Sequence, residues 1–246
     1  MLPLIGRPTF ILIACQPKSA STFLTQAIAN LPGFKSVGLV PGYDRREQEL
    51  CEARLQRFRF RQGKLYVAQH HVRHSLPTQQ LIDKYGICVV VLIRDLFDVV
   101  ISLRDHVRKE SPVGPMLYLD TAHPSLSDDA LEQAIARLAL PWYLNFYMSW
   151  RGVPGVTLVN YDDLLDQPRE TVASICAQAG IGATADVIDR AIAGARGQTT
   201  RFNKGQRGRG QLLSQTTRNL ILDLLALYPS ARSDPYFRSM LDGTGG

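Results

Sequence analysis

Runs of consecutive apolar residues constrain the fold of this chain more than any other feature of its sequence. Thr9 to Cys15 (TFILIAC) and Gly86 to Arg94 (GICVVVLIR) are rich in β-branched residues and do not alternate between apolar and polar positions. This pattern is typical of strands buried on both faces, as in a parallel sheet covered by helices. Lys64 to Gln69 and Val156 to Asn160 are predicted as two further strands.

Helical patterns separate these predicted strands. Thr22 to Leu31 follows the first strand, Asp44 to Arg61 is predicted as a charged helix, and Ser125 opens a capping sequence before a long helix that Pro141 is expected to kink. Strands that alternate with helices imply a parallel sheet, with ligands beyond the carboxyl ends of its strands. We therefore predict a three-layer α/β fold, a central parallel β-sheet flanked by helices, as one domain over residues 1–246.

The composition is that of a folded protein without a membrane-spanning segment. The chain has 246 residues, of which 45% are apolar and 20% charged, and this excludes a disordered chain. No run of about 18 apolar residues occurs, so we expect neither a spanning helix nor a membrane partner. The four cysteines form no CxxC pair, which argues against a disulfide framework and favours a cytoplasmic location.

The positive charge is concentrated near the C-terminus. Of the 28 Lys and Arg residues, six lie within residues 191–222, which contain no carboxylate, and the other 22 equal the number of Asp and Glu. A solvated basic segment and an anion site are both compatible with this pattern. Glycines between the cations favour a loop around a phosphate.

The segment that follows the first strand, Gln16 to Thr22 (QPKSAST), leads into a helix. Backbone N–H groups at the start of that helix, together with Lys18 and three hydroxyl groups, make a cradle for an anion. The segment is not a Walker A loop, because the leading glycine and the GK[ST] ending are missing. A polar turn with a solvated Lys18 is the alternative interpretation.

A second phosphate element follows the most apolar strand. Asp98, Ser102 and His106 come after Arg94 at steps of four, so we expect them on one face of the next helix. Arg94 is placed to bind a phosphate through its forked guanidinium group, and Ser102 offers a hydroxyl. The alternative is that Arg94 pairs with Asp98 and that Ser102 is only packed.

Together these segments resemble the nucleotide-dependent sulfotransferases, a P-loop-related family that uses 3′-phosphoadenosine 5′-phosphosulfate (PAPS). The resemblance implies the P-loop nucleotide-hydrolase-like sulfotransferase fold. The family's Arg-x-x-x-Asp-x-x-x-Ser motif, which binds the 3′-phosphate, is similar to Arg94, Asp98 and Ser102. Its Pro-Lys-Ser-Gly-Thr-Thr motif holds the 5′-phosphosulfate, and this chain has Ala20 in the glycine position. The resemblance assigns to this motif Pro17, Lys18, Ser19, Ala20, Ser21, Thr22 and Phe23.

Two further motifs extend the resemblance over roughly residues 8–215. Asn160 to Leu164 (NYDDL) is similar to the family's Tyr-Glu-Asp-Leu strand end, which implies that Tyr161 lies near the adenine. Asn203 to Gly208 is similar to the Arg-Lys-Gly-x-x-Gly loop that closes over the 3′-phosphate, with asparagine in place of the arginine. The residues assigned to this loop are Asn203, Lys204 and Gly205, and the candidates to compensate for the missing arginine are Arg201, Arg207 or Arg209.

Three of the five histidines lie in Gln69 to His74 (QHHVRH), at the end of a predicted strand. A structural role is one interpretation, and no metal site is expected because no carboxylate or cysteine lies nearby in the sequence. The family carries its catalytic base here in a Lys-Thr-His-hydrophobic pattern. Alignment on Val72 makes His71 the base and His70 the close alternative, with Gln69 where many members have lysine.

The resemblance implies in-line transfer of a sulfuryl group from PAPS, without a metal. His71 would take the acceptor's proton, and Lys18 would stabilise the oxygen between sulfur and the 5′-phosphate. Alcohols, phenols, amines, sugars and carrier-bound metabolites are all compatible acceptors, so we expect a small-molecule or carbohydrate acceptor and no nucleic acid. The arginine-rich segment 45–64 suggests an anionic acceptor, with a solvated helix as the alternative.

Two rival functions come from other classes. A non-catalytic nucleic-acid-binding protein would use the basic C-terminal stretch, but Phe202 is the only aromatic residue within residues 191–222, so base stacking would be poor there. A P-loop kinase is disfavoured because the GK[ST] ending is missing.

Overall fold

The computed structural model describes residues 8–42, 47–111, 116, 118–198 and 207–242. Contacts within the chain divide it into two compact units: Met1–Ile93 with Phe146–Phe202, and Arg94–Asn145 with Asn203–Gly246. The single domain predicted from the sequence stays a prediction, because one domain can contain two compact units.

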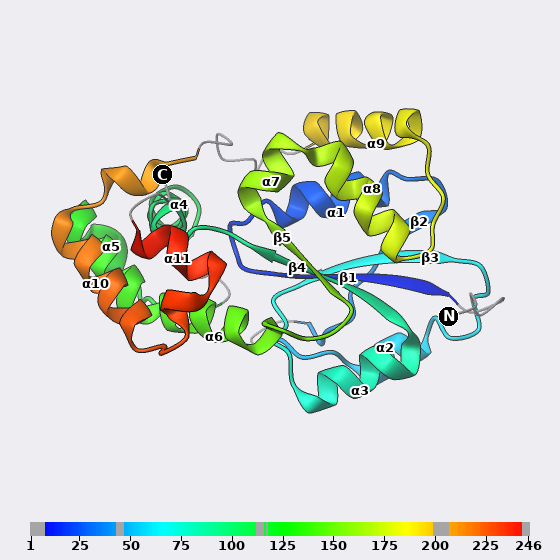
Figure 1. The fold of residues 1–246 in the computed structure, drawn as a ribbon, viewed down its shortest axis with the longest axis horizontal. Coiled ribbons are helices and arrows are strands. Elements are labelled where there is room, and N and C mark those ends of the chain that lie inside the picture. The colour runs from blue at the N-terminus through cyan, green and yellow to red at the C-terminus, as the bar shows by residue number, and fades with distance from the viewer. Residues whose placement is uncertain (1–7, 43–46, 112–115, 117, 199–206, 243–246) are drawn as a thin grey trace. The chain divides into compact units, whose positions relative to one another are not determined.

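The first unit contains a sheet of five parallel strands in the order β2-β3-β1-β4-β5 (Figure 1). The four predicted strands are present, two of them with the predicted bounds. β2 was not predicted, because three residues are too short to show a pattern of burial. The strands are β1 (Thr9–Cys15), β2 (Phe34–Ser36), β3 (Leu65–His70), β4 (Ile87–Ile93) and β5 (Val156–Asn160).

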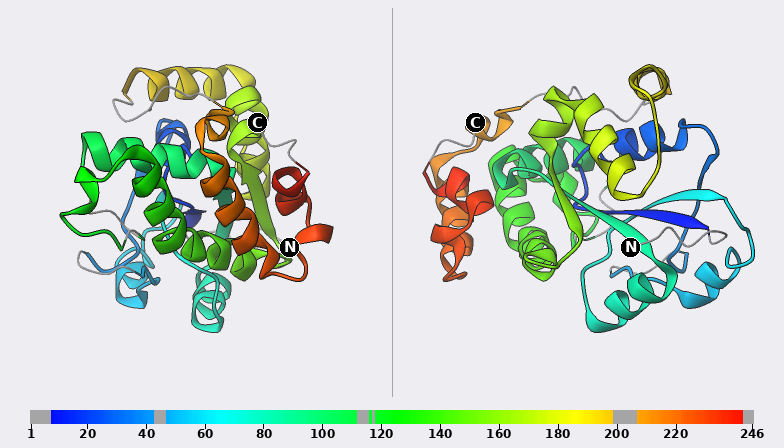
Figure 2. Two further views of the ribbon diagram at one scale, coloured as in Figure 1. Left: turned by 90° about the vertical axis from the view of Figure 1, so that its left-hand side faces the viewer. Right: turned by 45° about the vertical axis from the view of Figure 1, so that its right-hand side comes forward.

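Helices cover both faces of this sheet, as a parallel sheet requires, and the predicted three-layer α/β architecture is confirmed (Figure 1). The helices above the sheet in Figure 1 are α1 (Ser21–Ala29), α7 (Tyr161–Asp166), α8 (Pro168–Gln178) and α9 (Ala185–Gln198). Those below it are α2 (Glu52–Gln56) and α3 (Leu76–Tyr85). In both views of Figure 2, α9 lies next to α1, against which it packs.

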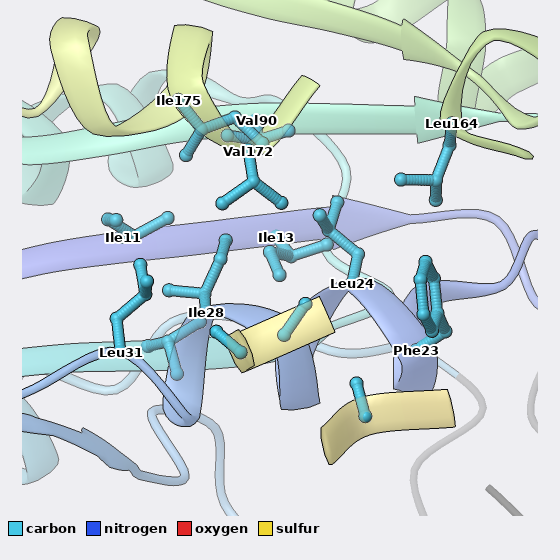
Figure 3. Packing of buried hydrophobic residues seen from close by; sticks show 14 of the residues in the cluster. Ile11, Ile13, Phe23, Leu24, Ile28, Leu31, Val90, Leu164, Val172 and Ile175 are labelled. Atoms are coloured by element: carbon cyan, nitrogen blue, oxygen red, sulfur yellow. The ribbon is translucent and has the colours of Figure 1, made fainter. Parts of the chain in front are cut away.

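A buried apolar cluster joins the upper helices to the sheet. Ile11 and Ile13 of β1 point toward Leu24 and Ile28 of α1 and toward Val172 of α8 (Figure 3). Burial of such side chains stabilises the fold by about 1.5–3 kcal/mol each. This packing fixes the start of α1 against the end of β1, where the first phosphate element lies.

The charged helix predicted over Asp44 to Arg61 is much shorter in the structure. Within its described part, only Glu52–Gln56 is helical. Gln48 instead forms a β-bridge with Val72, and residues 57–64 form successive turns. The predicted helix lacks a continuous apolar stripe, so packing does not stabilise it over its whole length.

The second unit is helical. Its elements are α4 (Leu96–Lys109), η1 (His123–Ser125), α5 (Asp128–Leu138), the first part of α6 (Leu140–Trp150), η2 (Arg209–Leu212), α10 (Gln215–Ala226), η3 (Ala231–Ser233) and α11 (Pro235–Leu241). Pro141 does not kink one long helix: α5 ends before it, and Pro141 lies in the first turn of α6, where proline is tolerated. Within the described ranges, no helix is both long and apolar enough to cross a bilayer.

Candidate active site

The carboxyl ends of β1 and β3 lie side by side in the first unit. The register pairs Ile13 with Gln69 and Ala14 with His70. Because the strands are parallel, the loop after β1 and the histidines after β3 emerge at the same edge of the sheet. The structure thus brings together the segment that begins at Gln16 and the two candidate bases, His70 and His71.

The loop after β1 has an unusual backbone. Lys18 and Ala20 have φ angles of 65° and 63°, in the left-handed region that residues other than glycine rarely adopt. The hydroxyl of Ser19, which is buried, donates to the carbonyl of Gln16 at 2.6 Å, and the N–H of Gln16 donates to Leu92 at 3.0 Å. These buried bonds hold the strained loop, which suits a site where backbone N–H groups face an anion.

The N-terminus of α1 has no capping side chain. Its N-cap is Ala20, its first turn has no acidic residue, and its first helical bond runs from Leu24 N to Ala20 O at 3.1 Å. By contrast, Ser75 caps α3 and Asp95 caps α4. The partial positive charge at the start of α1 is therefore not met by a cap, and it favours an anionic ligand.

An amide links this helix to the end of β3. Gln69 Nε2 donates to Ser21 Oγ at 2.8 Å, and Thr25 Oγ1 donates to Gln69 Oε1 at 3.3 Å. The resemblance aligns Gln69 with a lysine of many sulfotransferases, and here the Gln69 amide bonds to a hydroxyl on the first turn of α1. Lys18, three residues before Ser21, is the candidate site's cation closest along the chain to the first turn of α1.

The ring of His71 is fixed by β1. Its Nδ1 lies 2.7 Å from the carbonyl oxygen of Cys15, which can only accept, so Nδ1 carries the proton and the lone pair lies on Nε2. Gln48 Oε1 accepts the backbone N–H of His71 at 2.7 Å. Burial lowers the pKa of His71 below 6.5, although the bond to Cys15 opposes this shift. At neutral pH His71 is therefore a neutral imidazole whose Nε2 can accept a proton.

His70 has the opposite arrangement. Its Nε2 accepts the backbone N–H of Leu39 at 2.8 Å, so its lone pair is already used. Burial lowers the pKa of His70 to about 4, and the positive charges of His71 and Arg54 act in the same direction. Among the described residues, no group of three or more His, Cys, Asp and Glu residues is placed to hold a metal ion.

Sequence reasoning missed the two groups that position His71, the carbonyl of Cys15 and the side chain of Gln48. Cys15 ends β1, and the parallel register of β1 with β3 places it beside His71. A prediction that these two strands are neighbours would therefore have indicated the contact between Cys15 and His71. The thiol of Cys15 lies 3.5 Å from His71 Nδ1, and burial raises its pKa to about 12, so it stays protonated.

Arg94 and Ser102 lie in the second unit and are buried, 5% and 2% exposed. Asp98 and Ser102 are on α4 as predicted. Arg94 Nη2 pairs with Asp98 Oδ2 at 3.1 Å, which is the alternative that the sequence left open, and Asp98 Oδ1 accepts the N–H of Gly210 at 2.8 Å. A guanidinium group has five N–H donors, so the ion pair is compatible with a phosphate contact.

The described end of the basic stretch packs on α4. Arg209 Nη2 pairs with Asp105 Oδ2 at 2.7 Å, so its charge is met by a carboxylate. A Cβ on Gly210 would lie 2.4 Å from Cβ of Phe97, and therefore only glycine allows this approach. Residues 191–222 contain no acidic residue, but in the folded structure Asp105 of α4 pairs with Arg209. Outside the described residues lie Arg201, Asn203, Lys204 and Gly205.

Tyr161 is the first residue of α7, directly after β5, and is 3% exposed. It belongs to the first unit, as do Lys18 and His71, whereas Arg94 and Ser102 belong to the second.

The chain has the fold of solved sulfotransferases. A mouse sulfotransferase complexed with 3′,5′-adenosine bisphosphate (PAP) matches with a TM-score of 0.66 and 12% identity, over 96% of this chain and 88% of that chain. Retinol dehydratase in complex with androsterone and the inactive cofactor PAP matches with a TM-score of 0.57 and 14% identity, over 91% of this chain and 83% of that chain. A sulfotransferase from Alicyclobacillus acidocaldarius gives 0.51 and 14%, over 96% of both chains. No protein-family model and no curated protein matches the sequence.

Proposed function

We propose that this protein is a sulfotransferase that transfers the sulfuryl group of PAPS to a hydroxyl or amine of a small-molecule or carbohydrate acceptor. One observation carries the proposal: His71, whose Nδ1 is bonded to the Cys15 carbonyl, follows β3 at the sheet edge where α1 begins without a capping side chain. Sulfuryl transfer needs both parts, an anion cradle for the donor and a base for the acceptor. Two of the similar structures hold PAP, which supports the choice of donor.

The first unit would hold the phosphosulfate end of the donor. The first-turn N–H groups of α1, the hydroxyl of Ser21 and the ammonium group of Lys18 are donors of the kind that phosphate and sulfate oxygens require. When bound, PAPS supplies an activated sulfuryl group. Lys18 would act most strongly during transfer, because negative charge grows on the oxygen between sulfur and phosphorus as that bond breaks.

His71 would act as the general base. The acceptor oxygen or nitrogen forms a bond to sulfur as the bond between sulfur and the 5′-phosphate oxygen breaks, and PAP leaves with the electron pair of that bond. The acceptor's proton moves to His71 Nε2, and the Nδ1–H bond to Cys15 keeps the ring in the required tautomer. The resulting imidazolium returns its proton to water.

The second unit would hold the 3′-phosphate. Arg94, Ser102 and, from the loop outside the described residues, Lys204 and Gly205 are the groups proposed for it. Asp98 would keep the Arg94 guanidinium in one orientation, because its two oxygens bond to Arg94 and to Gly210 at once. These contacts lie far from the reacting atoms along the donor and so select the donor rather than stabilise the transition state.

Thermal stability in the presence of nucleotides tests the donor. PAP at 100 times its dissociation constant is expected to stabilise the protein by about 2.7 kcal/mol, and AMP at the same concentration far less. Equal stabilisation by AMP would contradict recognition of the 3′-phosphate. Incubation with labelled PAPS and a panel of alcohols, phenols, amines and sugars then tests transfer. Magnesium-dependent consumption of ATP without sulfuryl transfer would indicate a kinase instead.

A further inference from the structure

A second stretch of the chain carries cations without carboxylates, and the proposed reaction uses none of these cations. Residues 53–82 contain six Lys and Arg residues and no Asp or Glu. Four of these cations lie in residues 57–64 (RFRFRQGK), between α2 and β3. We call residues 57–64 the basic turn.

The basic turn is anchored to the sheet by one aromatic ring. The ring of Phe58 is half-buried, with its centroid 4.7 Å from that of Tyr66 and 6.1 Å from that of Phe10. The N–H of Arg61 donates to Phe58 O at 2.9 Å, and Lys64 O accepts the N–H of Thr9 at 2.9 Å. The turn is therefore a defined surface and not a loose linker.

Everything else in the basic turn faces solvent. Phe60 is 80% exposed, the largest value among the exposed large apolar side chains of the described residues. All four cations of the turn are exposed, and within the described ranges none of them forms an ion pair with a carboxylate. Exposed Lys35 adds a further cation, because β2 pairs it with Tyr66 beside the turn. An exposed aromatic ring among unneutralised cations marks an interaction surface.

The position of the turn separates it from the candidate active site. The turn precedes β3, and His71 follows it, so the two lie at opposite ends of a six-residue strand. At about 3.3 Å per residue, roughly 20 Å lie between them. The cations of the turn are thus too far from His71 to bind an anionic acceptor there.

We propose that the basic turn binds the surface of a bilayer that contains anionic phospholipids, with Phe60 entering the headgroup region. Cations attract the negatively charged lipids, and an aromatic ring on the same turn adds apolar burial. The sequence-based expectation of no membrane partner rested on the lack of a spanning segment, and a peripheral contact needs none. Nucleic acid fits less well, because successive bases stack on several aromatic rings and Phe60 is the one exposed aromatic ring of residues 57–64.

Vesicle sedimentation tests the proposal with the full chain. The wild-type protein should bind vesicles of phosphatidylcholine and phosphatidylglycerol at 3:1, and bind pure phosphatidylcholine far more weakly. Because each cation near an anionic surface contributes roughly fivefold, R57Q/R59Q/R61Q should lower the partition coefficient about 100-fold. Phe60→Ala should lower it about tenfold. The matched control R137Q/R190Q/R232Q removes the same charge from exposed positions elsewhere and should change binding less than twofold.

A fluorescent variant tests insertion directly. The chain has two tryptophans, both buried, so Phe60→Trp adds the exposed one. Its emission should shift to the blue on addition of anionic vesicles and be quenched by brominated lipid. No shift, or equal loss of binding in the two triple variants, would overturn the proposal. So would poly(U) RNA binding that depends on the turn while vesicle binding does not.

Discussion

Replacement of His71 should lower turnover with little change in stability, whereas replacement of His70 should lower stability with little change in turnover. The two variants therefore separate a catalytic role from a structural role. His71→Asn retains an N–H donor near the position of Nδ1 for the Cys15 carbonyl but removes Nε2. Turnover should therefore fall about 10²–10⁴-fold, the usual contribution of a positioned general base. PAP binding and the free energy of unfolding should change little, because the asparagine amide can still donate to the Cys15 carbonyl.

His70→Ala should instead weaken the fold. It removes the acceptor of the Leu39 N–H, and an unsatisfied buried donor costs about 1–3 kcal/mol. For a chain of this size, Tm should fall by about 2–4 °C for each kcal/mol. His70→Gln places an amide oxygen near the position of Nε2 and should restore most of this loss. Turnover of both His70 variants should stay within about tenfold of wild type.

The pH dependence of stability gives an independent check on His70. Its pKa is about 4 in the folded protein and about 6.5 when unfolded, so between these values only the unfolded state binds the proton. The stability from this group is complete above pH 6.5 and is lost as pH falls toward 4, by at most about 3 kcal/mol. His70→Gln should flatten this part of the curve.

The measurements are urea unfolding from pH 7 to 4, calorimetry with PAP, and steady-state kinetics with any acceptor found in the screen. If His70→Gln abolishes turnover while His71→Asn retains it, the assignment of the base is wrong by one residue. If both retain turnover, the base lies elsewhere or the acceptor needs none. If His71→Asn no longer binds PAP, its loss of activity says nothing about proton transfer, and the reasoning from the Cys15 contact is refuted.

Five further outcomes are expected. Lys18→Ala should lower kcat more than donor affinity, with Lys109→Ala as the control. Arg94→Ala should instead weaken donor binding by about 1.5–3 kcal/mol and abolish the preference for a 3′-phosphate. Calorimetry and kinetics measure both effects, and the reverse pattern would contradict the two roles. Ala20→Gly should stabilise the protein by about 1 kcal/mol, since glycine adopts a φ of 63° without strain, and an unchanged unfolding curve would argue against the strained loop. Gly210→Ala should lower stability by about 1–3 kcal/mol through overlap with α4 and weaken PAP binding, as thermal melts with and without PAP would show. The acidic limb of kcat/KM should have its midpoint below pH 6.5, because burial lowers the pKa of His71, and a midpoint above 6.5 would contradict this environment.

Local pattern in the sequence was enough for the parts of this protein that depend on neighbours along the chain. Apolar runs such as Thr9–Cys15 identified the strands because burial on both faces leaves no polar positions. The four-residue spacing from Arg94 to Ser102 identified one helix face, and it also contained the Arg94–Asp98 pair. The segment Gln16 to Thr22 was predicted as an anion cradle because its polar residues directly precede a helix, and this role stays a prediction.

Contacts between distant segments decided the rest. The rings of the two histidines differ through distant partners: Leu39, 31 residues from His70, and Cys15, 56 residues from His71. Asp105 neutralises Arg209 across 104 residues, so a stretch that is purely basic in the sequence is not so in space. No local pattern contains such pairings, because strand order and helix packing bring these groups together. The chemical types at the site were therefore readable from the chain, whereas the protonation and partners of each group required the folded structure.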